Sequence, residues 1–449
     1  MSKIKSQYVC QQCGVAYPKW LGQCLECNAW NSLVEEIMQP KSVSAKTYTG
    51  SVSQQVYNLG EVKIQEYQRF SLGLEELDRV VGGGLVPGSV SLIGGDPGIG
   101  KSSLLLQVLA HLSLKMPVLY VSGEESLEQI ALRAQRMELS QKNLNLFAET
   151  NVEAISAAIM QLRPQVVVID SIQTMQVQEI SGAPGGVSQV RESAAALTRL
   201  AKQSNTAIFL VGHVTISGEV AGPRVLEHIV DTVIYLEGQP DGRYRLLRAL
   251  KNRFGPVNEL GVFAMTDKGM REVKNPSAIF LSRQDVRPGS VVANIWEGTR
   301  PLLLELQALV DDNHYGQPKR LSLGYDLNRL NLMLAILHKH GGLAFHQQDV
   351  FINVVGGVKI SETSADLGVA LALISSYKNR VVPQDTLVFG EVGLSGEIRP
   401  VNFGPERLQE AFKHGFKRAI IPEGNCSKYL PKEMEIIAVK QIKDVMDLI

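Results

Sequence analysis

One run of residues has the composition and spacing of a phosphate site. Residues 95–102 read Gly-Asp-Pro-Gly-Ile-Gly-Lys-Ser, after an apolar stretch and before a helix-like one. Glycines let successive backbone N–H groups converge on an anion, and a helix N-terminus adds partial positive charge. The lysine of such a loop reaches the β- and γ-phosphates, and the serine hydroxyl completes a Mg²⁺ shell. The run therefore predicts a nucleoside triphosphate site, formed by Gly95, Asp96, Pro97, Gly98, Ile99, Gly100, Lys101, Ser102 and Ser103.

Four cysteines near the N-terminus form a second group, Cys10-x-x-Cys13 and Cys24-x-x-Cys27. A two-residue gap lets both thiolates of a pair face one ion, and two pairs close a tetrahedral site. The segment is too short and polar to bury a core, so metal binding would itself drive its folding. The spacing predicts a structural zinc site, and iron in the same four-thiolate site is the alternative.

Acidic residues follow two apolar stretches of the chain. Asp170 ends the stretch 166–169 and is expected to support Mg²⁺. Glu124 and Glu125 follow the stretch 118–121, and ligands of parallel sheets bind at the carboxyl ends of strands. We therefore expect Glu124 to orient the attacking water, with Glu125 as second choice. The alternative is plain helix capping around Ser126.

The elements that must hold these residues alternate between apolar and amphipathic stretches. Candidate strands are 89–93, 118–121, 166–169, 207–211 and 232–236, and candidate helices are 103–112, 127–139, 152–162 and 190–203. This alternation predicts an α/β fold with a mainly parallel sheet covered on both faces. Residues 236–250 read as a β-hairpin. His213 follows the fourth strand and could sense the γ-phosphate or be an ordinary structural histidine.

The amino-acid composition limits which classes of protein the chain can belong to. The 449 residues carry a formal net charge of zero and are 45% hydrophobic, which predicts two or three globular domains. A balanced charge means that any nucleic-acid contact must come from local basic patches. We see no signal peptide and no apolar run of membrane-spanning length, so a cytoplasmic location without membrane contact is expected. The predicted segments are a zinc module 1–38, a linker 39–58, an ATPase domain 59–277 and a third domain 278–449.

The order of these motifs resembles a family. The cysteine pairs, the phosphate loop, Val-Ser-Gly-Glu-Glu-Ser at 121–126 and Lys-Asn-Arg-Phe-Gly at 251–255 resemble the bacterial RadA (Sms) DNA repair proteins over essentially the whole chain. The resemblance implies a zinc ribbon, a RecA-like ATPase core and a Lon protease-like C-terminal domain. It also implies an ATPase that uses ATP, Mg²⁺ and Zn²⁺, binds single-stranded DNA, and drives branch migration of recombination intermediates in DNA repair. RecA recombinase as a partner and a homohexameric ring are implied as well.

Basic residues could complete such a motor. A cation inserted from a neighbouring subunit stabilises charge on the γ-phosphate, and we expect Lys251 and Arg253 to act in this way or on DNA. A solvated basic turn is the alternative, since Arg243, Arg245 and Arg248 precede the motif. RecA-like proteins bind single strands through loops, here 173–186 and 217–224. The candidate DNA-binding cations are Arg224, Lys251, Arg253, Arg287, Arg300, Lys319 and Arg320.

The C-terminal domain lacks the residues of a Lon-type peptidase. Ser364 aligns with the nucleophile of that family, but Asp366 replaces a glycine and Pro405 falls where the lysine base should stand. Arg407 lies nearby but does not deprotonate usefully. We therefore expect no peptidase activity and a scaffolding role in the ring. Two other functions stay open: a KaiC-like regulatory ATPase that acts on protein partners and, with less support, a Lon-like peptidase.

Overall fold

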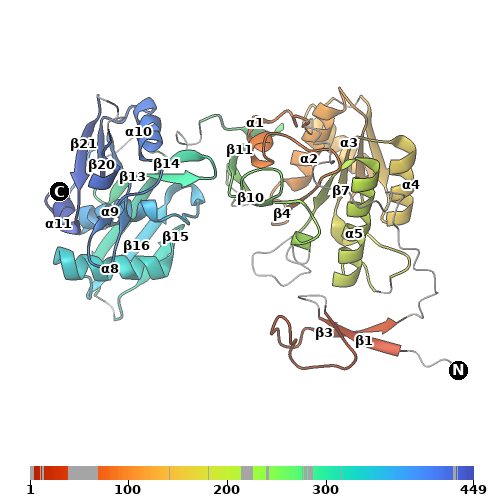
Figure 1. Ribbon diagram of the computed structural model, residues 1–449, viewed down its shortest axis with the longest axis horizontal. Helices are drawn as coiled ribbons and strands as arrows, with labels where there is room; N and C mark the ends of the chain where they lie inside the picture. Colours follow the sequence, from red (N-terminus) through yellow and green to blue (C-terminus); the bar gives the residue numbers. More distant parts are fainter. Residues whose placement is uncertain are drawn as a thin grey trace, which may run out of the picture. The chain divides into compact units, whose positions relative to one another are not determined.

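The computed structural model describes residues 5–10, 12, 15–38, 69–140, 142–180, 182–213, 226–238, 242–275, 277, 281, 287–314, 316–427, 431 and 433–449 (Figure 1). The chain divides into two compact units, Met1–Val273 and Lys274–Ile449, and each is described by itself. Among the helices in these ranges, none is long and apolar enough to cross a membrane.

The first unit begins with a three-stranded antiparallel ribbon in the order β2-β1-β3. Its strands are β1 (Lys5–Cys10), β2 (Ala16–Tyr17) and β3 (Leu33–Met38). Its small interior consists of Cys10, Cys24 and Leu33. So few apolar side chains cannot stabilise a fold of this size, which agrees with a ribbon held by metal.

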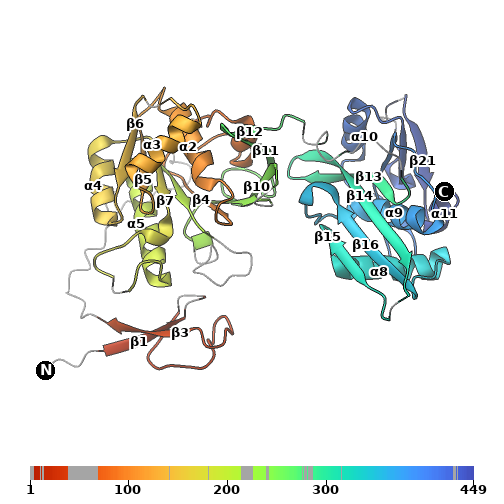
Figure 2. The ribbon, with the colours of Figure 1, turned by 180° about the vertical axis from the view of Figure 1, so that it is seen from behind.

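The rest of the first unit is built on a nine-stranded sheet in the order β12-β11-β10-β9-β4-β8-β7-β5-β6 (Figure 2). Its six parallel strands are β4 (Val90–Gly95), β5 (Val118–Ser122), β6 (Leu144–Ala148), β7 (Val166–Asp170), β8 (Ala207–Val211) and β9 (Thr232–Glu237). Antiparallel strands β10 (Tyr244–Asn252), β11 (Leu260–Thr266) and β12 (Gly269–Glu272) extend one edge. All five predicted strands are present, and β9 and β10 form the predicted hairpin.

Helices cover both faces of this sheet, as the alternating pattern predicted. One face packs against α1 (Glu75–Val80), α2 (Lys101–Leu112) and α3 (Leu127–Arg136). The other packs against α4 (Val152–Leu162) and α5 (Val187–Ser204). The predicted helix 127–139 ends early, at Arg136, because Glu138 adopts a positive φ of 54°. Ser126 caps α3 in a capping box with Gln129.

The second unit is a mixed sheet in the order β15-β16-β14-β13-β17-β20-β21. Its strands are β13 (Ser290–Glu297), β14 (Arg300–Asp312), β15 (Arg320–Leu323), β16 (Gln348–Val354), β17 (Thr386–Val388), β20 (Arg418–Pro422) and β21 (Glu435–Val439). A small pair, β18 (Glu391–Val392) and β19 (Ile398–Arg399), stands apart. The helices are α8 (Leu327–Gly341), α9 (Asp366–Lys378), α10 (Gly404–Lys413) and α11 (Ile442–Met446).

Four short 3₁₀ turns complete the described elements. They are η2 (Ile172–Thr174), η3 (Val355–Gly357), η4 (Thr363–Ala365) and η5 (Glu423–Asn425). The turn η4 leads directly into α9, whose first ten residues are all buried. Residues 363–366 are therefore fixed within the core of the second unit.

Candidate nucleotide site and metal centre

The phosphate loop connects β4 to α2, as predicted. Gly95 and Gly100 have φ values of 145° and 111°, which side chains rarely adopt. A Cβ at Gly95 would lie 2.5 Å from the Leu236 carbonyl oxygen, and one at Gly100 would lie 2.5 Å from the Met270 methyl carbon. Pro97 and Gly98 are exposed at the crest, while Ile99 is buried and anchors the loop. Conformation requires glycine at both positions, and at Gly95 the backbone of Leu236 also leaves no space for a side chain.

Lys101 opens α2 and turns its ammonium back into the loop. Nζ donates to the Gly95 carbonyl at 2.7 Å and to the Asp96 carbonyl at 2.9 Å. Burial lowers the pKa of Lys101, and the carboxylates of Asp170, Asp96 and Glu124 oppose that effect. The ammonium therefore lies between the loop and the acidic residues, where a bound phosphate would replace its carbonyl partners.

Asp170 ends β7 and lies beside the start of α2. Its carboxylate accepts a hydrogen bond from the Tyr120 hydroxyl, and the Ser102 hydroxyl interacts with it from the phosphate loop. Burial raises the pKa of Asp170, and the interactions with Tyr120 and Ser102 act against the increase. A serine hydroxyl and a carboxylate in contact are oxygen ligands of the kind Mg²⁺ prefers, so the pair fits that ion.

Glu124 lies at the carboxyl end of β5, beside the same strands. It accepts a hydrogen bond from the Ser171 hydroxyl, and its carboxylate lies 3.4 Å from His213 Nε2. The contact with His213, then that with Ser171, lowers the pKa of Glu124 although burial raises it. The structure thus brings Glu124 and His213 together with Lys101 and Asp170.

Glu125 occupies a different environment from its neighbour. Its carboxylate forms an ion pair with Arg133 of α3, and its backbone N–H donates to the Ser122 hydroxyl at 3.0 Å. The side chain is engaged in holding α3 against β5, next to the Ser126 cap. Of the two glutamates, only Glu124 contacts residues that follow β7 and β8.

The basic motif 251–255 begins inside a strand. Lys251 lies in β10, and its ammonium donates to the backbone carbonyls of Glu227 and Val230, the latter at 2.8 Å. Burial and the nearby guanidinium of Arg253 lower the pKa of Lys251. Arg253 is 58% exposed and lies 3.4 Å from a carboxylate oxygen of buried Asp231, which also pairs with Lys202. Arg253 is therefore the more accessible cation of the two.

The remaining predicted DNA contacts divide into three groups. Arg224 and the loop 217–224 lie outside the described residues. Arg320 donates to the backbone carbonyls of Lys319, Gln348 and Phe345, so its guanidinium holds the surrounding backbone in place. Lys319 and Arg287 are exposed, while Arg300 is half-buried at the start of β14.

The cysteine cluster has the proximity of a metal centre. The sulfur atoms of Cys10, Cys24 and Cys27 all lie within 4.8 Å of one another, and no disulfide joins these three. Cys13 lies outside the described residues. The backbone N–H of Cys10 donates to the Val15 carbonyl, and that of Cys24 donates to the Ala29 carbonyl, each at 2.9 Å. Three converging thiols on two such turns fit a tetrahedral metal site.

Two contacts of the site were not predicted. Tyr120 belongs to no recognised motif. Its hydroxyl lies in an otherwise apolar buried strand, however, and a buried tyrosine hydroxyl usually has a polar partner. Arg245 was considered part of a solvated turn, and that interpretation is wrong: it is 2% exposed, and its Nε donates to the Ile99 carbonyl of the phosphate loop at 3.1 Å. Arg248 is also mostly covered and pairs with Glu237.

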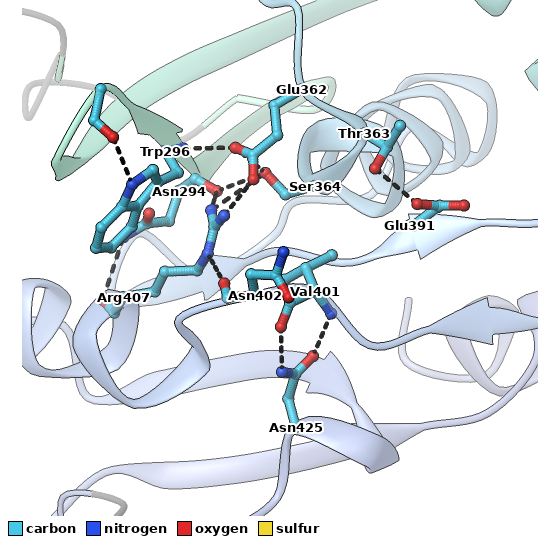
Figure 3. A network of polar contacts seen from close by, with 11 residues as sticks. Asn294, Trp296, Glu362, Thr363, Ser364, Glu391, Val401, Asn402, Arg407 and Asn425 are labelled. Carbon is cyan, nitrogen blue, oxygen red and sulfur yellow. Dashed lines mark hydrogen bonds and ion pairs between the residues drawn. The ribbon is translucent and has the colours of Figure 1, made fainter. Parts of the chain in front are cut away.

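Figure 3 shows what surrounds the serine of the second unit. Ser364 is fully buried, and its hydroxyl donates to Glu362 at 2.7 Å. Arg407 of α10, also fully buried, donates to the Ser364 oxygen at 3.2 Å, forms an ion pair with Glu362, and donates to the Asn402 carbonyl at 2.9 Å. Its guanidinium lies against the rings of Trp296 and Phe389.

Together these features define a class: a P-loop ATPase with an N-terminal metal-binding ribbon and a Lon-like C-terminal domain. Family models match in the same order, one described as an AAA domain at residues 61–219, one as a rubredoxin metal binding domain at 8–35, and one as subunit ChlI of Mg-chelatase at 331–425. They confirm the predicted fold class.

Whole-chain relatives identify the family. The chain is 58% identical to a DNA repair protein RadA from Pseudomonas aeruginosa, over 100% of this chain and 99% of that protein. It is 53% identical to the RadA of Escherichia coli, over 99% of this chain and 98% of that protein, and 45% identical to that of Bacillus subtilis, over 99% of both. The chain belongs to the RadA family, which confirms the resemblance.

Proposed function

We propose that this protein is a DNA-dependent ATPase that binds single-stranded DNA and drives branch migration of recombination intermediates in DNA repair. One observation carries the proposal. In a member of the RadA family, Lys101, Asp170 and Glu124 interact with one another at the phosphate loop. This is the arrangement needed to hold and hydrolyse a triphosphate.

Each residue has a distinct task in that reaction. The loop N–H groups and Lys101 hold the phosphates of ATP, and Ser102 with Asp170 would hold Mg²⁺, which neutralises charge on the β- and γ-phosphates. Glu124 orients the attacking water and accepts its proton. Since His213 and Ser171 lower the pKa of Glu124, its carboxylate is ionised near neutral pH and can take up that proton.

Coupling to DNA needs more than one subunit. We place Arg253 at the neighbouring subunit's nucleotide within a homohexameric cytoplasmic ring, because its guanidinium is more than half exposed. Lys251, bonded to two carbonyls in its own chain, would support the segment that precedes β9. The DNA path would use Arg224, Arg287, Arg300 and Lys319, and RecA and branched DNA are the proposed partners.

The test is the rate of ATP hydrolysis by the full chain with and without single-stranded DNA. We expect the rate to rise with DNA and the stimulation to fade as salt increases, because phosphate contacts release counterions. Lys101→Ala should abolish hydrolysis in both conditions, while Lys115→Ala, an exposed lysine just after α2, should behave as the wild type. A rate indifferent to DNA would contradict the proposal and favour a KaiC-like regulator of protein partners.

We also propose that the Lon-like domain has no peptidase activity and acts as a scaffold. The hydroxyl of Ser364 is inaccessible, its hydrogen bond goes to the Glu362 carboxylate, and that carboxylate is already paired with Arg407. The guanidinium of Arg407, on the other side of the serine oxygen, donates hydrogen bonds and does not accept a proton. Pro405, at the start of α10, has no basic group. An unfolded protein substrate incubated with the full chain and ATP should stay intact, and its cleavage would overturn this part of the proposal.

A further inference from the structure

A buried tyrosine lies directly behind the proposed metal site. Tyr120 is in the middle of β5 and is fully buried, with apolar neighbours on both sides along the strand. Its ring belongs to the core formed by the sheet, α2 and α3. Phenylalanine would fill nearly the same volume, so packing alone does not explain the hydroxyl.

The hydroxyl has one well-placed partner. It donates to Oδ2 of Asp170, on the adjacent parallel strand β7, where Tyr120 is paired in register with Val168. A buried hydroxyl without a partner would be costly, and a charge-assisted hydrogen bond to a carboxylate is among the stronger ones.

Asp170 is thereby held from within the core. Tyr120 is its hydrogen-bond partner there, and the Ser102 hydroxyl interacts with the same carboxylate from the phosphate loop. A terminal carboxylate otherwise rotates easily about its last torsion angle, since that torsion is broad. A fixed rotation presents an oxygen toward the position that a metal would share with Ser102.

We infer that Tyr120 is a positioning residue, which orients the Asp170 carboxylate for the divalent cation of the bound nucleotide. The inference rests on the proposed ATPase site, and it deepens that proposal. Partners that orient a metal-binding side chain typically affect metal affinity about 10- to 100-fold when they are removed. Because the Tyr120 hydroxyl bonds Asp170 and, among the described hydrogen bonds, no atom of the phosphate loop, its loss should spare binding of the nucleotide itself.

The experiment is Tyr120→Phe in the full-length protein, which removes one oxygen and keeps the ring. Mn²⁺ replaces Mg²⁺ as the probe, and free Mn²⁺ is followed by electron paramagnetic resonance in the presence of saturating ADP. We expect the apparent Kd for Mn²⁺ to rise about tenfold. The Kd of a fluorescent ADP analogue in EDTA should change less than about twofold, because Lys101 and the loop are intact.

Two controls separate positioning from packing. Leu119→Ala, in the same strand but packed on the other face of the sheet, should lower Tm without changing Mn²⁺ affinity. In an Asp170→Asn background, Tyr120→Phe should add no further loss of Mn²⁺ affinity, since the acceptor charge is already gone. This second comparison still applies if Tyr120→Phe alone is poorly stable.

Each outcome bears on one proposal. If the Mn²⁺ affinity of Tyr120→Phe stays within about twofold of the wild type, Tyr120 only packs in the core and the inference is overturned. An equal loss of nucleotide binding in EDTA would overturn it as well, because the effect would then be on the whole loop. Failure of the wild-type protein to bind or hydrolyse ATP would instead defeat the proposed function.

Discussion

At the scale of single residues, the site combines one buried ammonium with several carboxylates. Lys101 interacts with Asp170, Asp96 and Glu124, so negative charge exceeds positive charge among these four side chains. A divalent cation would restore the balance, and the hydrogen bonds from Tyr120 to Asp170 and from Ser171 to Glu124 stabilise the carboxylates in its absence. The neighbours of each carboxylate therefore decide which one accepts a proton and which one supports the metal.

The pKa of Glu124 leads to a prediction about pH. The contact with His213 is the first cause of the lowered pKa, so His213→Ala should raise the pKa of Glu124 toward its ordinary value. A base must be ionised to act, so the acidic limb of the pH–rate profile should move to higher pH, with activity lost first below neutrality. The measurement is kcat/KM for ATP from pH about 4 to 8.

The pH test of His213→Ala has one matched control and one outcome that would contradict the prediction. His228→Ala removes an exposed histidine from the same unit and should leave the profile in place. An acidic limb that stays where it is in His213→Ala would show that Glu124 is not the group that titrates in catalysis.

Motifs predicted the residues of the proposed nucleotide site better than the residues that hold them in place. Lys101, Ser102 and Asp170 belong to patterns with fixed spacing along the chain, and the structure places them together. Tyr120 and Ser171 belong to none, because their role depends on which strands are neighbours and on the register between β5 and β7. Sequence spacing carries no information on that register, whereas the apolar character of the strands does predict their burial.

At the scale of elements, the hairpin of β9 and β10 supports the loop that binds phosphate. Leu236 of β9 leaves no room for a side chain at Gly95, and Arg245 of β10 bonds the Ile99 carbonyl. The same guanidinium donates to the Tyr244 carbonyl at 3.0 Å, so it links the strand to the loop. A conformational change in the hairpin would therefore shift the phosphate loop directly.

Arg245→Met should loosen the loop. The substitution leaves buried carbonyls without their charged donor, at a cost of about 2 kcal/mol for each group left unsatisfied. We expect a lower Tm and a KM for ATP raised by about tenfold, a change of about 1.4 kcal/mol in binding. Arg243→Met, which alters an exposed neighbour that lies over the Tyr244 ring, should change neither. An unchanged KM in Arg245→Met would show that the hydrogen bond does not shape the loop.

The ribbon provides a second prediction at this scale. With so few buried apolar side chains among its described residues, the segment 5–38 should unfold when its metal is removed. We propose zinc, and Cys24→Ser should lose one equivalent of it by elemental analysis, whereas Cys426→Ser, an exposed cysteine of the second unit, should lose none. Limited proteolysis should then cut the ribbon while the ATPase core stays intact. Iron in the wild-type protein would contradict the assignment of zinc.

Element boundaries show where sequence patterns lose information. The strands β4, β5, β7, β8 and β9 were predicted because burial on both faces makes them continuously apolar. β6 was missed because it is the edge strand and only partly buried, so polar Asn145 interrupts the pattern. The antiparallel β11 and β12 were also missed, and β12, with four residues bounded by turns, resembles an ordinary loop.

At the scale of the whole molecule, the chain joins an ATPase unit to a unit in which the serine aligned with the Lon nucleophile is enclosed by other side chains. The second unit keeps a serine at the start of α9, but a buried ion pair of Arg407 and Glu362 surrounds it. The sequence predicted the loss of the lysine. It did not predict that Arg407 would contact the serine, because that contact depends on how α10 packs against β13.

This arrangement predicts that the arginine has become structural. Arg407→Met would leave Glu362 and the Asn402 carbonyl without their donor, and breaking a buried pair costs about 3 kcal/mol, less where one partner reaches water as Glu362 does. Arg418→Met, which breaks an exposed ion pair with Glu435, should cost at most about 1 kcal/mol. Urea unfolding of the full-length variants measures the difference between the two.

Arg407→Lys makes the sharper test, because it returns a lysine to the neighbourhood of Ser364. A lysine cannot reproduce the forked hydrogen bonds to Glu362, Ser364 and Asn402, so the second unit should lose stability. Peptidase activity should nevertheless stay absent, since the serine hydroxyl is inaccessible to a peptide and is engaged in a hydrogen bond to Glu362. Cleavage of an unfolded substrate by this variant would mean that only the missing base had silenced the site. Its absence together with reduced stability would mean that the surrounding core has been rebuilt around the arginine, as a scaffold requires.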